Sequence, residues 1–594
     1  MAFLPPTRQN LTRRSFVLAG AALASFPVLM GRLFYLQGIS GSRYKQLAEE
    51  NRVSLRLIQP ERGRLLDRGG QVIAQDKQVF RLVLIPEQCP DIPAVLKRLS
   101  GLVELPQERI DKVIEDSKKL AKFSQVTVLK TLPFRDLAQI QVNLPDLPGI
   151  DFVPVALRHY FGGESVGHIV GYTGRPDEAT NQRISRFTAW SPDFPVGRRG
   201  LEKSLEDKLR GKSGYRNLEV NAYGRAIREI ERNDPIDGED VNLSLDLDLQ
   251  VKAWEELEGY EGGAVVMNVQ TGEILAAASR PSFDTNNFVD GLDQEEWKAL
   301  QQDPNKPLIN RPLQGVYAPG STFKTVVALA ALNEGLAKPE EEITCKGHIQ
   351  FGNRKFHCWK RHGTLNLSQA IQHSCDIYFY ELGDRLGIDK ISQYARLFGL
   401  GQAYNTGLPE SAGLVPTRDW KRRVYNEPWV GGENLITAIG QGYMLTTPLQ
   451  LATMTARVAT GKKVEPTLEV VQSDQGLFEE ITIPQKHFDI VHKGMYDVVN
   501  HKRGTAYWYA RIKEFDMAGK SGTSQVISQR FDDDVDMETV NKRKRPHALF
   551  VAYAPADNPR FAVSVVVEHG ASGSRAASPI VKNLMKATME KYPL

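Results

Sequence analysis

The pattern of apolar and polar residues begins with a segment that fits a membrane better than a globular core. Residues 15–36, "SFVLAGAALASFPVLMGRLFYL", contain an uninterrupted apolar core of about 17 residues, the lower limit for a helix that spans a bilayer. Three arginines precede it, and no acidic residue occurs before Glu49. Because positively charged flanks stay in the cytoplasm, we expect a cytoplasmic tail at 1–14, a membrane anchor at 15–36, and the remaining chain outside.

The same segment also fits a cleaved export signal. Arg13 and Arg14 form a twin-arginine pair in "TRRSF", and Ala22-Leu23-Ala24 resembles a cleavage site. The apolar residues continue well past Ala24, where a signal peptide should end. The uncleaved anchor is therefore the favoured interpretation.

Residues 37–240 show a mixed, loop-rich pattern. The stretch 52–74, "RVSLRLIQPERGRLLDRGGQVIA", alternates as strands do and is interrupted by proline and glycine. The stretches 109–123 and 198–211 have the periodicity of amphipathic helices. No cluster of catalytic residue types stands out in this region.

The pattern becomes more regular from residue 241 onward. Residues 262–279 form two β-rich runs joined by a turn at Gly272, which predicts a hairpin. Helical patterns follow, and two further strands, "PHALFVAYAP" and "RFAVSVVVEHG", precede a helix at 578–590. Strands at both ends with helices between them predict one α+β domain at 241–594, whose sheet joins distant segments.

Composition changes this picture little. The 594 residues are enough for two or three domains, and 41% hydrophobic with 25% charged residues is typical of a folded protein. The net charge of +4 is small for this length, so we expect no nucleic-acid partner.

Ser321 is the first candidate nucleophile. It precedes an apolar helix in "APGSTFKTVVALAALNEG", and Lys324 shares its helix face. A serine needs a base to take its proton, and a lysine kept neutral by burial can act as one. The helix N-terminus would favour a developing oxyanion. Alternatively, Ser321 is an N-cap followed by a surface lysine; a second Ser-x-x-Lys, Ser42 to Lys45, reads as a solvated helix face.

Two later motifs strengthen the catalytic interpretation. Ser374-Cys375-Asp376 lies 53 residues after Ser321, and Lys520-Ser521-Gly522-Thr523 falls in a strand-like context near the end. Ser-x-x-Lys, Ser-x-Asn or Asp, and Lys-Ser-Gly in this order are typical of serine acyltransferases that react with β-lactams.

The sequence resembles the class B penicillin-binding proteins, most of all the penicillin-binding protein 2 group of Gram-negative rod elongation. The resemblance covers nearly the whole chain, including "ERGRLLDRGG", "GGESVGHIVGYTG", "GLEKSLEDKLRG", "YAPGSTFK" and "AIGQGYMLTTPLQLA". It implies an elongated mixed α/β pedestal of the dimerisation type at 37–240. It also implies a transpeptidase domain like that of serine β-lactamases at 241–594, with an antiparallel sheet flanked by helices. The protein would sit in the bacterial inner membrane, with its bulk in the periplasm.

The resemblance also implies roles for individual residues. Ser321 would attack the D-Ala–D-Ala carbonyl of a peptidoglycan stem peptide, Lys324 would act as base, Ser374 would relay the proton, and Lys520 would support them electrostatically. Substrate would be bound by Asp376, Ser521, Gly522 and Thr523. Backbone N–H groups of Ser321 and Thr523 would form the oxyanion hole. Asp376 stands where most relatives have Asn, which leaves the contacts of this residue open.

The implied function is cross-linking of stem peptides during cell elongation and shape maintenance, through an acyl-enzyme that needs no cofactor. β-Lactam antibiotics would acylate the same serine. The implied partners are the polytopic elongation glycosyltransferase and the scaffold protein of the rod complex. The alternative is a membrane-anchored, β-lactam-reactive D,D-carboxypeptidase or sensor.

Other functions fit the sequence less well. A class A β-lactamase needs a Glu-x-x-Leu-Asn segment, which the sequence lacks, and a sensor needs a larger membrane portion. Residues 163–167 match Gly-x-Ser-x-Gly, but no long helix follows, as a nucleophile elbow requires. The basic run 541–547, "NKRKRPH", is either a solvated loop or a rim that attracts anionic glycan or peptide carboxylates.

The cysteines suggest a metal site. Cys345, Cys358, His362 and Cys375 follow the spacing Cys-x12-Cys-x3-His-x12-Cys, which could close a tetrahedral Cys3His site. A Cys345–Cys358 disulfide with a buried Cys375 remains the alternative. The resemblance favours a structural zinc here, since some relatives have a zinc site around the cysteine of the middle motif. Other candidates for the nitrogen ligand are His348, His357 and His373.

Overall fold

The computed structural model divides into two compact units by its internal contacts. It describes residues 13–39, 53–120, 122–178, 180, 194–220, 226–289, 291–292, 294–473, 477–526 and 539–593. The first unit comprises Met1–Glu61, Asp177–Phe194 and Gly211–Asp237, and the second comprises Arg62–Pro176, Pro195–Arg210 and Gly238–Leu594.

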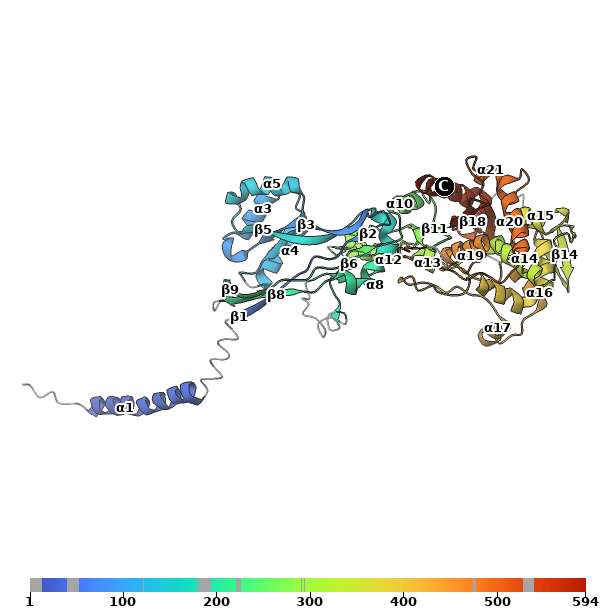
Figure 1. The fold of residues 1–594 in the computed structure, drawn as a ribbon. Helices are drawn as coiled ribbons and strands as arrows, with labels where there is room; N and C mark the ends of the chain where they lie inside the picture. The colour runs from blue at the N-terminus through green and yellow to red at the C-terminus, as the bar shows by residue number, and fades with distance from the viewer. Residues whose placement is uncertain are drawn as a thin grey trace, which may run out of the picture. The chain divides into compact units, whose positions relative to one another are not determined.

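The first unit contains the N-terminal helix and a small sheet (Figure 1). Helix α1 spans Arg13–Phe34, and a π-helical turn continues it over Tyr35–Ile39. The segment Phe16–Ile39 is long and apolar enough to cross a membrane, which fits the anchor predicted at 15–36. The antiparallel sheet has the order β1 (Val53–Ile58), β8 (Gly214–Val220), β9 (Ala226–Asn233).

A second sheet is built around the 13-residue strand β3, at the start of the second unit. β3 (Val72–Leu84) pairs antiparallel along β5 (Ile150–Tyr160), and the remaining path is β10-β2-β3-β4. The helices over this sheet bury a separate apolar cluster that includes Leu82, Leu96 and Ile140. The other elements are β2 (Leu65–Leu66), β4 (Val126–Leu132), β10 (Val241–Asn242), α3 (Ile92–Leu99), α4 (Gln107–Lys119) and α5 (Phe134–Asn143).

The single helix predicted at 198–211 is wrong. The structure has two short helices, α8 (Gly200–Ser204) and α9 (Glu206–Leu209), separated at Leu205. With this break the carboxylates of Glu202 and Glu206 lie in the interior, where they form ion pairs with arginines. Apolar periodicity places such acids on the solvent side of a helix, so it cannot anticipate this arrangement.

Those buried carboxylates form an ionic network. The Glu202 carboxylate, which is inaccessible to solvent, accepts from Arg62 Nε at 2.6 Å and from Arg158 Nε at 2.7 Å. Arg62 also donates to Glu206 at 2.7 Å. Burial alone would raise the pKa of the Glu202 carboxyl, but the two guanidinium groups outweigh burial and lower it. The network thus fixes the segment before β2 against α8 and α9.

The C-terminal region contains a five-stranded antiparallel sheet with the order β12-β11-β19-β18-β17. Both faces are buried, and the side chains alternate between them: Val265 and Met267 belong to one core, Ala264 and Val266 to the other. The strands are β11 (Gly262–Asn268), β12 (Ile274–Arg280), β17 (Ala518–Ser524), β18 (His547–Ala554) and β19 (Phe561–Val567). The predicted hairpin, the strand pair and the α+β class are confirmed.

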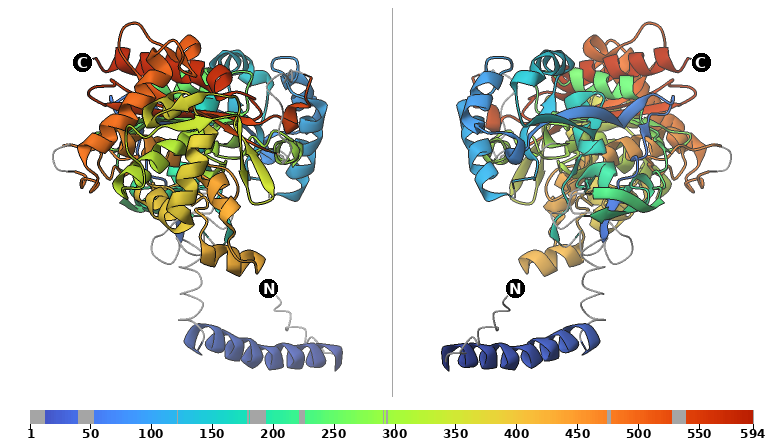
Figure 2. Two further views of the ribbon diagram at one scale, coloured as in Figure 1. Left: turned by 90° about the vertical axis from the view of Figure 1, so that its right-hand side faces the viewer. Right: turned by 90° about the vertical axis from the view of Figure 1, so that its left-hand side faces the viewer.

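Helices cover both faces of this sheet. On one face α10 (Leu247–Glu255) packs against α22 (Ser578–Lys591), where Lys591 Nζ pairs with Asp246 at 2.6 Å (Figure 2). On the other face lie the apolar α14 (Lys324–Asn333), α16 (Asp376–Leu397) and α19 (Pro448–Thr460). The helices α15 (Leu367–Gln372), α18 (Gly431–Ala438), α20 (Gln485–Asn500) and α21 (Tyr507–Ala510) complete the part of this region that concerns the site. The helix predicted at 578–590 is confirmed as α22.

The ionic network generates a stability prediction. Glu202→Ala leaves two buried guanidinium groups without their shared carboxylate, so we expect the free energy of unfolding to fall by about 3–5 kcal/mol. Glu115→Ala, which removes an exposed i,i+4 pair with Lys119, should change it little. Urea unfolding followed by tryptophan fluorescence measures both, and equal effects of the two substitutions would contradict the role given to the network.

Candidate active site

Ser321 lies in a turn that touches strand β17 through backbone atoms. The 3-10 turn Gly320–Phe323 leads directly into α14, and Ser321 in it is half-buried. Gly320 has φ 54°, and a Cβ there would lie 2.6 Å from the Thr523 carbonyl oxygen. Glycine is therefore required at this position, and the serine is held next to Thr523.

Lys324 connects the first motif to the second. Its ammonium donates to Asp376 Oδ1 at 2.7 Å and to the Ser374 carbonyl at 2.9 Å, and its Nζ lies 3.4 Å from Ser374 Oγ. The lysine side chain is inaccessible to solvent, and that of Asp376 is 13% exposed. The structure therefore places Lys324 in a buried ion pair and not on the surface, which contradicts the alternative interpretation of Ser-x-x-Lys as an N-cap with a solvated lysine.

Lys520 connects the third motif to the same serine. Its Nζ donates to Ser374 Oγ at 2.9 Å and to the Ser521 carbonyl at 2.9 Å. Burial and the positive charge of Lys324 hold the pKa of Lys520 well below its ordinary value, while Asp376 acts in the opposite direction. Ser374 Oγ thus lies within hydrogen-bonding distance of two buried amines, as a proton relay requires.

Ser374 owes its position to an unusual backbone conformation. It has φ 54°, which is rare for a residue other than glycine, and it sits between the end of α15 and the start of α16. The Cys375 N–H donates to the Ala370 carbonyl at 2.9 Å, which closes the turn. The αL conformation turns the chain so that Ser374 and Asp376 both reach the lysines.

The substrate-binding residues predicted on β17 lie at the open edge of the sheet. A Cβ at Gly522 would lie 2.9 Å from Thr322 Cγ2, so glycine allows the strand to approach the serine turn. The Ser521 and Thr505 hydroxyls are 3.1 Å apart.

Sequence reasoning missed three residues of this neighbourhood. Thr505 contacts Ser521, the Gly440 carbonyl accepts from the Gly320 N–H at 2.8 Å, and Gln441 donates to the Thr523 carbonyl at 2.7 Å. The glycine-rich run 438–442, "AIGQG", was a visible signal that a backbone approaches another segment closely here.

Cys345, Cys358, His362 and Cys375 form a cluster behind the middle motif. Their four potential ligand atoms all lie within 4.8 Å of one another, and this is the one such group among the described residues. Two short hairpin-like pairs bring them together: β13 (Ile343–Cys345) with β16 (Gly363–Leu365), and β14 (His348–Phe351) with β15 (Arg354–His357). The cysteines are free thiols in this structure.

The cluster is in contact with the segment that carries Ser374 and Asp376. His362 Nδ1 lies 3.5 Å from Cys345 Sγ and 3.4 Å from Cys358 Sγ. A hydrogen bond from the Cys375 thiol lowers the pKa of Cys358 to about 2, and the same contact raises that of Cys375. The Asp376 N–H donates to Cys358 Sγ at 3.2 Å. The sulfur atoms therefore fix the backbone at the start of α16.

The Gly-x-Ser-x-Gly match at 163–167 forms no nucleophile elbow. Ser165 is buried and donates to the Gly162 carbonyl at 2.8 Å, and the helix that follows, α6 (Gly167–Val170), has four residues. The serine caps a local turn.

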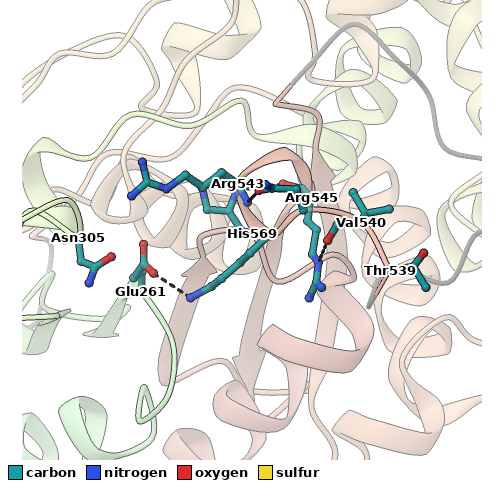
Figure 3. A pocket seen from close by; sticks show the side chains of 9 residues that line it. Glu261, Asn305, Thr539, Val540, Arg543, Arg545 and His569 are labelled. Atoms are coloured by element: carbon teal, nitrogen blue, oxygen red, sulfur yellow. Dashed lines mark hydrogen bonds and ion pairs between the residues drawn. The ribbon is translucent and has the colours of Figure 1, made fainter.

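The basic run 541–547 borders an open cavity of about 610 Å³ (Figure 3). Lys542 Nζ pairs with Glu261 at 2.8 Å, and Arg545 Nε donates to the Val540 carbonyl at 2.9 Å. Attraction of glycan or peptide carboxylates by this rim stays a prediction. The cavity is lined by Glu261, Asn305, Thr539, Val540, Asn541, Lys542, Arg543, Arg545 and His569.

Two family models match the chain. Residues 57–243 match the penicillin-binding protein dimerisation domain, and residues 262–586 match the penicillin-binding protein transpeptidase domain. These limits are compatible with the predicted division at residue 240, which stays a prediction.

Known relatives match along nearly the whole chain. The peptidoglycan D,D-transpeptidase MrdA of Haemophilus influenzae is 32% identical, and the match covers 97% of this chain and 92% of the relative. A solved complex of penicillin-binding protein 2 (PBP2) with MreC from Helicobacter pylori contains a chain that is 30% identical, with a TM-score of 0.77, covering 91% of this chain and 99% of that one. A chain of a peptidoglycan synthase complex that coordinates polymerization and crosslinking is 31% identical, with a TM-score of 0.73, covering 97% and 98%. The chain therefore belongs to the penicillin-binding protein transpeptidases and, within them, to the MrdA (PBP2) group.

Proposed function

We propose that Ser321, Lys324, Ser374 and Lys520 carry out the acyl transfer of this peptidoglycan D,D-transpeptidase. The observation that supports the proposal most directly is that Lys324 and Lys520, which are 196 residues apart in the sequence, both lie within hydrogen-bonding distance of the Ser374 hydroxyl. Lys324 also directly follows the turn that contains Ser321. Lys324, Ser374, Asp376 and Lys520 thus form one connected network, and Ser321 lies in the turn that leads into Lys324.

In the acylation step, Ser321 Oγ attacks the carbonyl of the penultimate D-Ala of a stem peptide. In its neutral form Lys324 takes the serine proton, and Asp376, which pairs with the Lys324 ammonium in the structure, stabilises the ammonium that results. The N–H groups of Ser321 and Thr523 bind the oxyanion. The bond to the terminal D-Ala nitrogen breaks. Ser374 passes its hydroxyl proton to the leaving amine and takes in its place the proton that Lys324 removed from Ser321, with Lys520 supporting the relay. Ser521 and Thr523 bind the terminal carboxylate.

In the second step, an amine of a neighbouring stem peptide attacks the acyl-enzyme and forms the cross-link. Water in place of that amine gives D,D-carboxypeptidase activity, so this activity is a side reaction of the same site. A β-lactam acylates Ser321 in the same way, but its leaving nitrogen remains tethered in the ring.

We further propose that the cysteine cluster binds one structural zinc ion. Three sulfurs and one imidazole nitrogen are a donor set typical of structural zinc, and ligands of one tetrahedral ion lie about 3.3–3.8 Å apart. The 3.4 and 3.5 Å contacts of His362 Nδ1 fit that spacing. The zinc would take no part in acyl transfer. The thiols of Cys358 and Cys375 would bind it as thiolates, and the loop that carries Ser374 and Asp376 would be fixed.

The location and partners are proposed from the relatives and the N-terminal helix. The apolar segment Phe16–Ile39 would anchor the chain in the bacterial inner membrane, with the catalytic region in the periplasm, where peptidoglycan is made. The complexes of related chains with MreC and within a peptidoglycan synthase support a scaffold protein and a polytopic glycosyltransferase as partners.

The nucleophile is tested by Ser321→Ala. We expect the covalent penicillin adduct, measured by mass spectrometry of the intact protein, to disappear because the proposed acyl-enzyme forms on the Ser321 hydroxyl. Ser42→Ala, in the second Ser-x-x-Lys outside the described residues, should leave the adduct intact. An adduct that persists on Ser321→Ala protein would show that the nucleophile is assigned wrongly.

The charge of Asp376 predicts a pH effect. The carboxylate raises the pKa of Lys520 against burial and Lys324, so Asp376→Asn should lower that pKa further, and the lysine then loses its proton at a lower pH. We expect the pH profile of the acylation rate to move to lower pH. The control is Asp384→Asn, an exposed residue on the same helix, which should leave the profile in place. A profile that stays fixed or moves upward would contradict the electrostatic role.

The metal is tested by Cys375→Ser. Elemental analysis should find one zinc per chain in the unmodified protein and nearly none in the variant. Acylation by penicillin should fall roughly tenfold or more as a consequence, because ligand loss frees the Ser374 segment. Cys89→Ala, remote from the cluster, should retain the zinc. Absence of zinc from the unmodified protein, together with a mapped Cys345–Cys358 disulfide, would overturn the proposal.

A further inference from the structure

Strand β17 is the edge of its sheet, and its outer side is the side on which a peptide can bind. β18 pairs with one side of β17, and among the residues that the structure describes no further strand follows it in the sheet order. An exposed strand edge binds an extended peptide by backbone hydrogen bonds. The Thr523 carbonyl points to the outer side of β17. Because the N–H and C=O of one residue in an extended strand point the same way, the Thr523 N–H points to this side as well.

One side chain already occupies this edge. Gln441 lies in the loop after α18, and its Nε2 donates to the Thr523 carbonyl at 2.7 Å. Its Oε1 accepts from the Gln525 N–H at 3.4 Å. A single carboxamide thus occupies the Thr523 carbonyl and the N–H of Gln525, which follows the end of β17.

The position of the loop is fixed independently of this side chain. The Gly440 carbonyl accepts from the Gly320 N–H at 2.8 Å, and a Cβ at Gly440 would lie 2.2 Å from the Gly320 carbonyl oxygen. The backbone contact with the serine turn therefore holds the loop, and the Gln441 carboxamide can leave the strand edge without releasing it.

The acyl donor needs to hydrogen-bond to the Thr523 carbonyl oxygen, which Gln441 already contacts. In the proposed reaction, the scissile carbonyl accepts from the Thr523 N–H and the terminal carboxylate lies toward Ser521, so the donor runs antiparallel to β17. In a hydrogen-bonded antiparallel pair, the two facing residues exchange both N–H···O bonds. The amide N–H of the penultimate D-Ala must then donate to the Thr523 carbonyl.

We propose that Gln441 is a specificity-determining residue that occupies the Thr523 carbonyl and competes with acyl donors that carry an amide N–H on the carbon next to the scissile carbonyl. Such a donor must displace Gln441, and its own hydrogen bond only replaces the one that is lost. A donor without that N–H leaves Gln441 in place, so the residue reduces the advantage that the amide N–H would otherwise give. The inference rests on the proposed function, because it takes Ser321 as the nucleophile.

A matched pair of β-lactams provides the test. Benzylpenicillin has an acylamino N–H at the position that corresponds to the penultimate D-Ala amide, and penicillanic acid has hydrogen there. The measurement is the ratio of their second-order acylation rate constants on the full-length protein, compared between the unmodified chain and Gln441→Ala. In Gln441→Ala the amide N–H of benzylpenicillin no longer competes with a side chain for the Thr523 carbonyl. The rate constant for benzylpenicillin divided by that for penicillanic acid should therefore rise roughly three- to tenfold, which corresponds to the free energy of one neutral hydrogen bond.

Two further variants make the result decisive. Gln441→Met keeps the length of the side chain but cannot donate, so it should raise the ratio as Gln441→Ala does; it also replaces that variant if the alanine protein does not fold. Gln485→Ala makes the same chemical change on the exposed start of α20 and should leave the ratio as it is. An unchanged or lower ratio in both Gln441 variants would overturn the inference. If the proposed function itself is wrong, the result is different, because neither β-lactam would then acylate Ser321 in the unmodified protein.

Discussion

The site depends on the cost of burying two positive charges beside each other. Lys324 and Lys520 are both inaccessible to solvent, and both reach one serine hydroxyl. The Asp376 carboxylate is in direct contact with Lys324 and offsets part of their repulsion. An arrangement of this kind persists only if the surrounding structure holds all three motifs in place. The sheet, the apolar helix α14 and the cysteine cluster meet this requirement by fixing β17, the serine turn and the start of α16.

Local sequence patterns were sufficient for several elements of the C-terminal region and for the motifs. The hairpin at 262–279, the late strand pair and the last helix have the periodicities of their elements, and each is present. The three catalytic motifs are short and contiguous, so their residues could be named before their distances were known. The cysteine spacing likewise indicated which four residues meet.

Contacts between segments far apart in the sequence could not be predicted from local patterns. Nothing near Glu202 indicates that Arg62, 140 residues earlier, will reach it in the interior. Gln441 is a polar residue in a loop, and its role follows only from its position beside the strand edge. The hydrogen bond from the Asp376 N–H to Cys358 also depends on a turn whose serine adopts a positive φ, which residue type does not predict.

Main-chain atoms pack closely against the serine turn at two glycines. Gly320 meets the carbonyl of Thr523, and Gly440 meets the carbonyl of Gly320, each too closely for a side chain. For a bacterium under antibiotic selection, these two glycines offer little room for change, because a side chain at either one would displace the turn that carries Ser321. Substitutions that alter access to Ser321 and leave the turn in place are therefore expected at neighbouring residues, whose side chains can change without displacing the backbone.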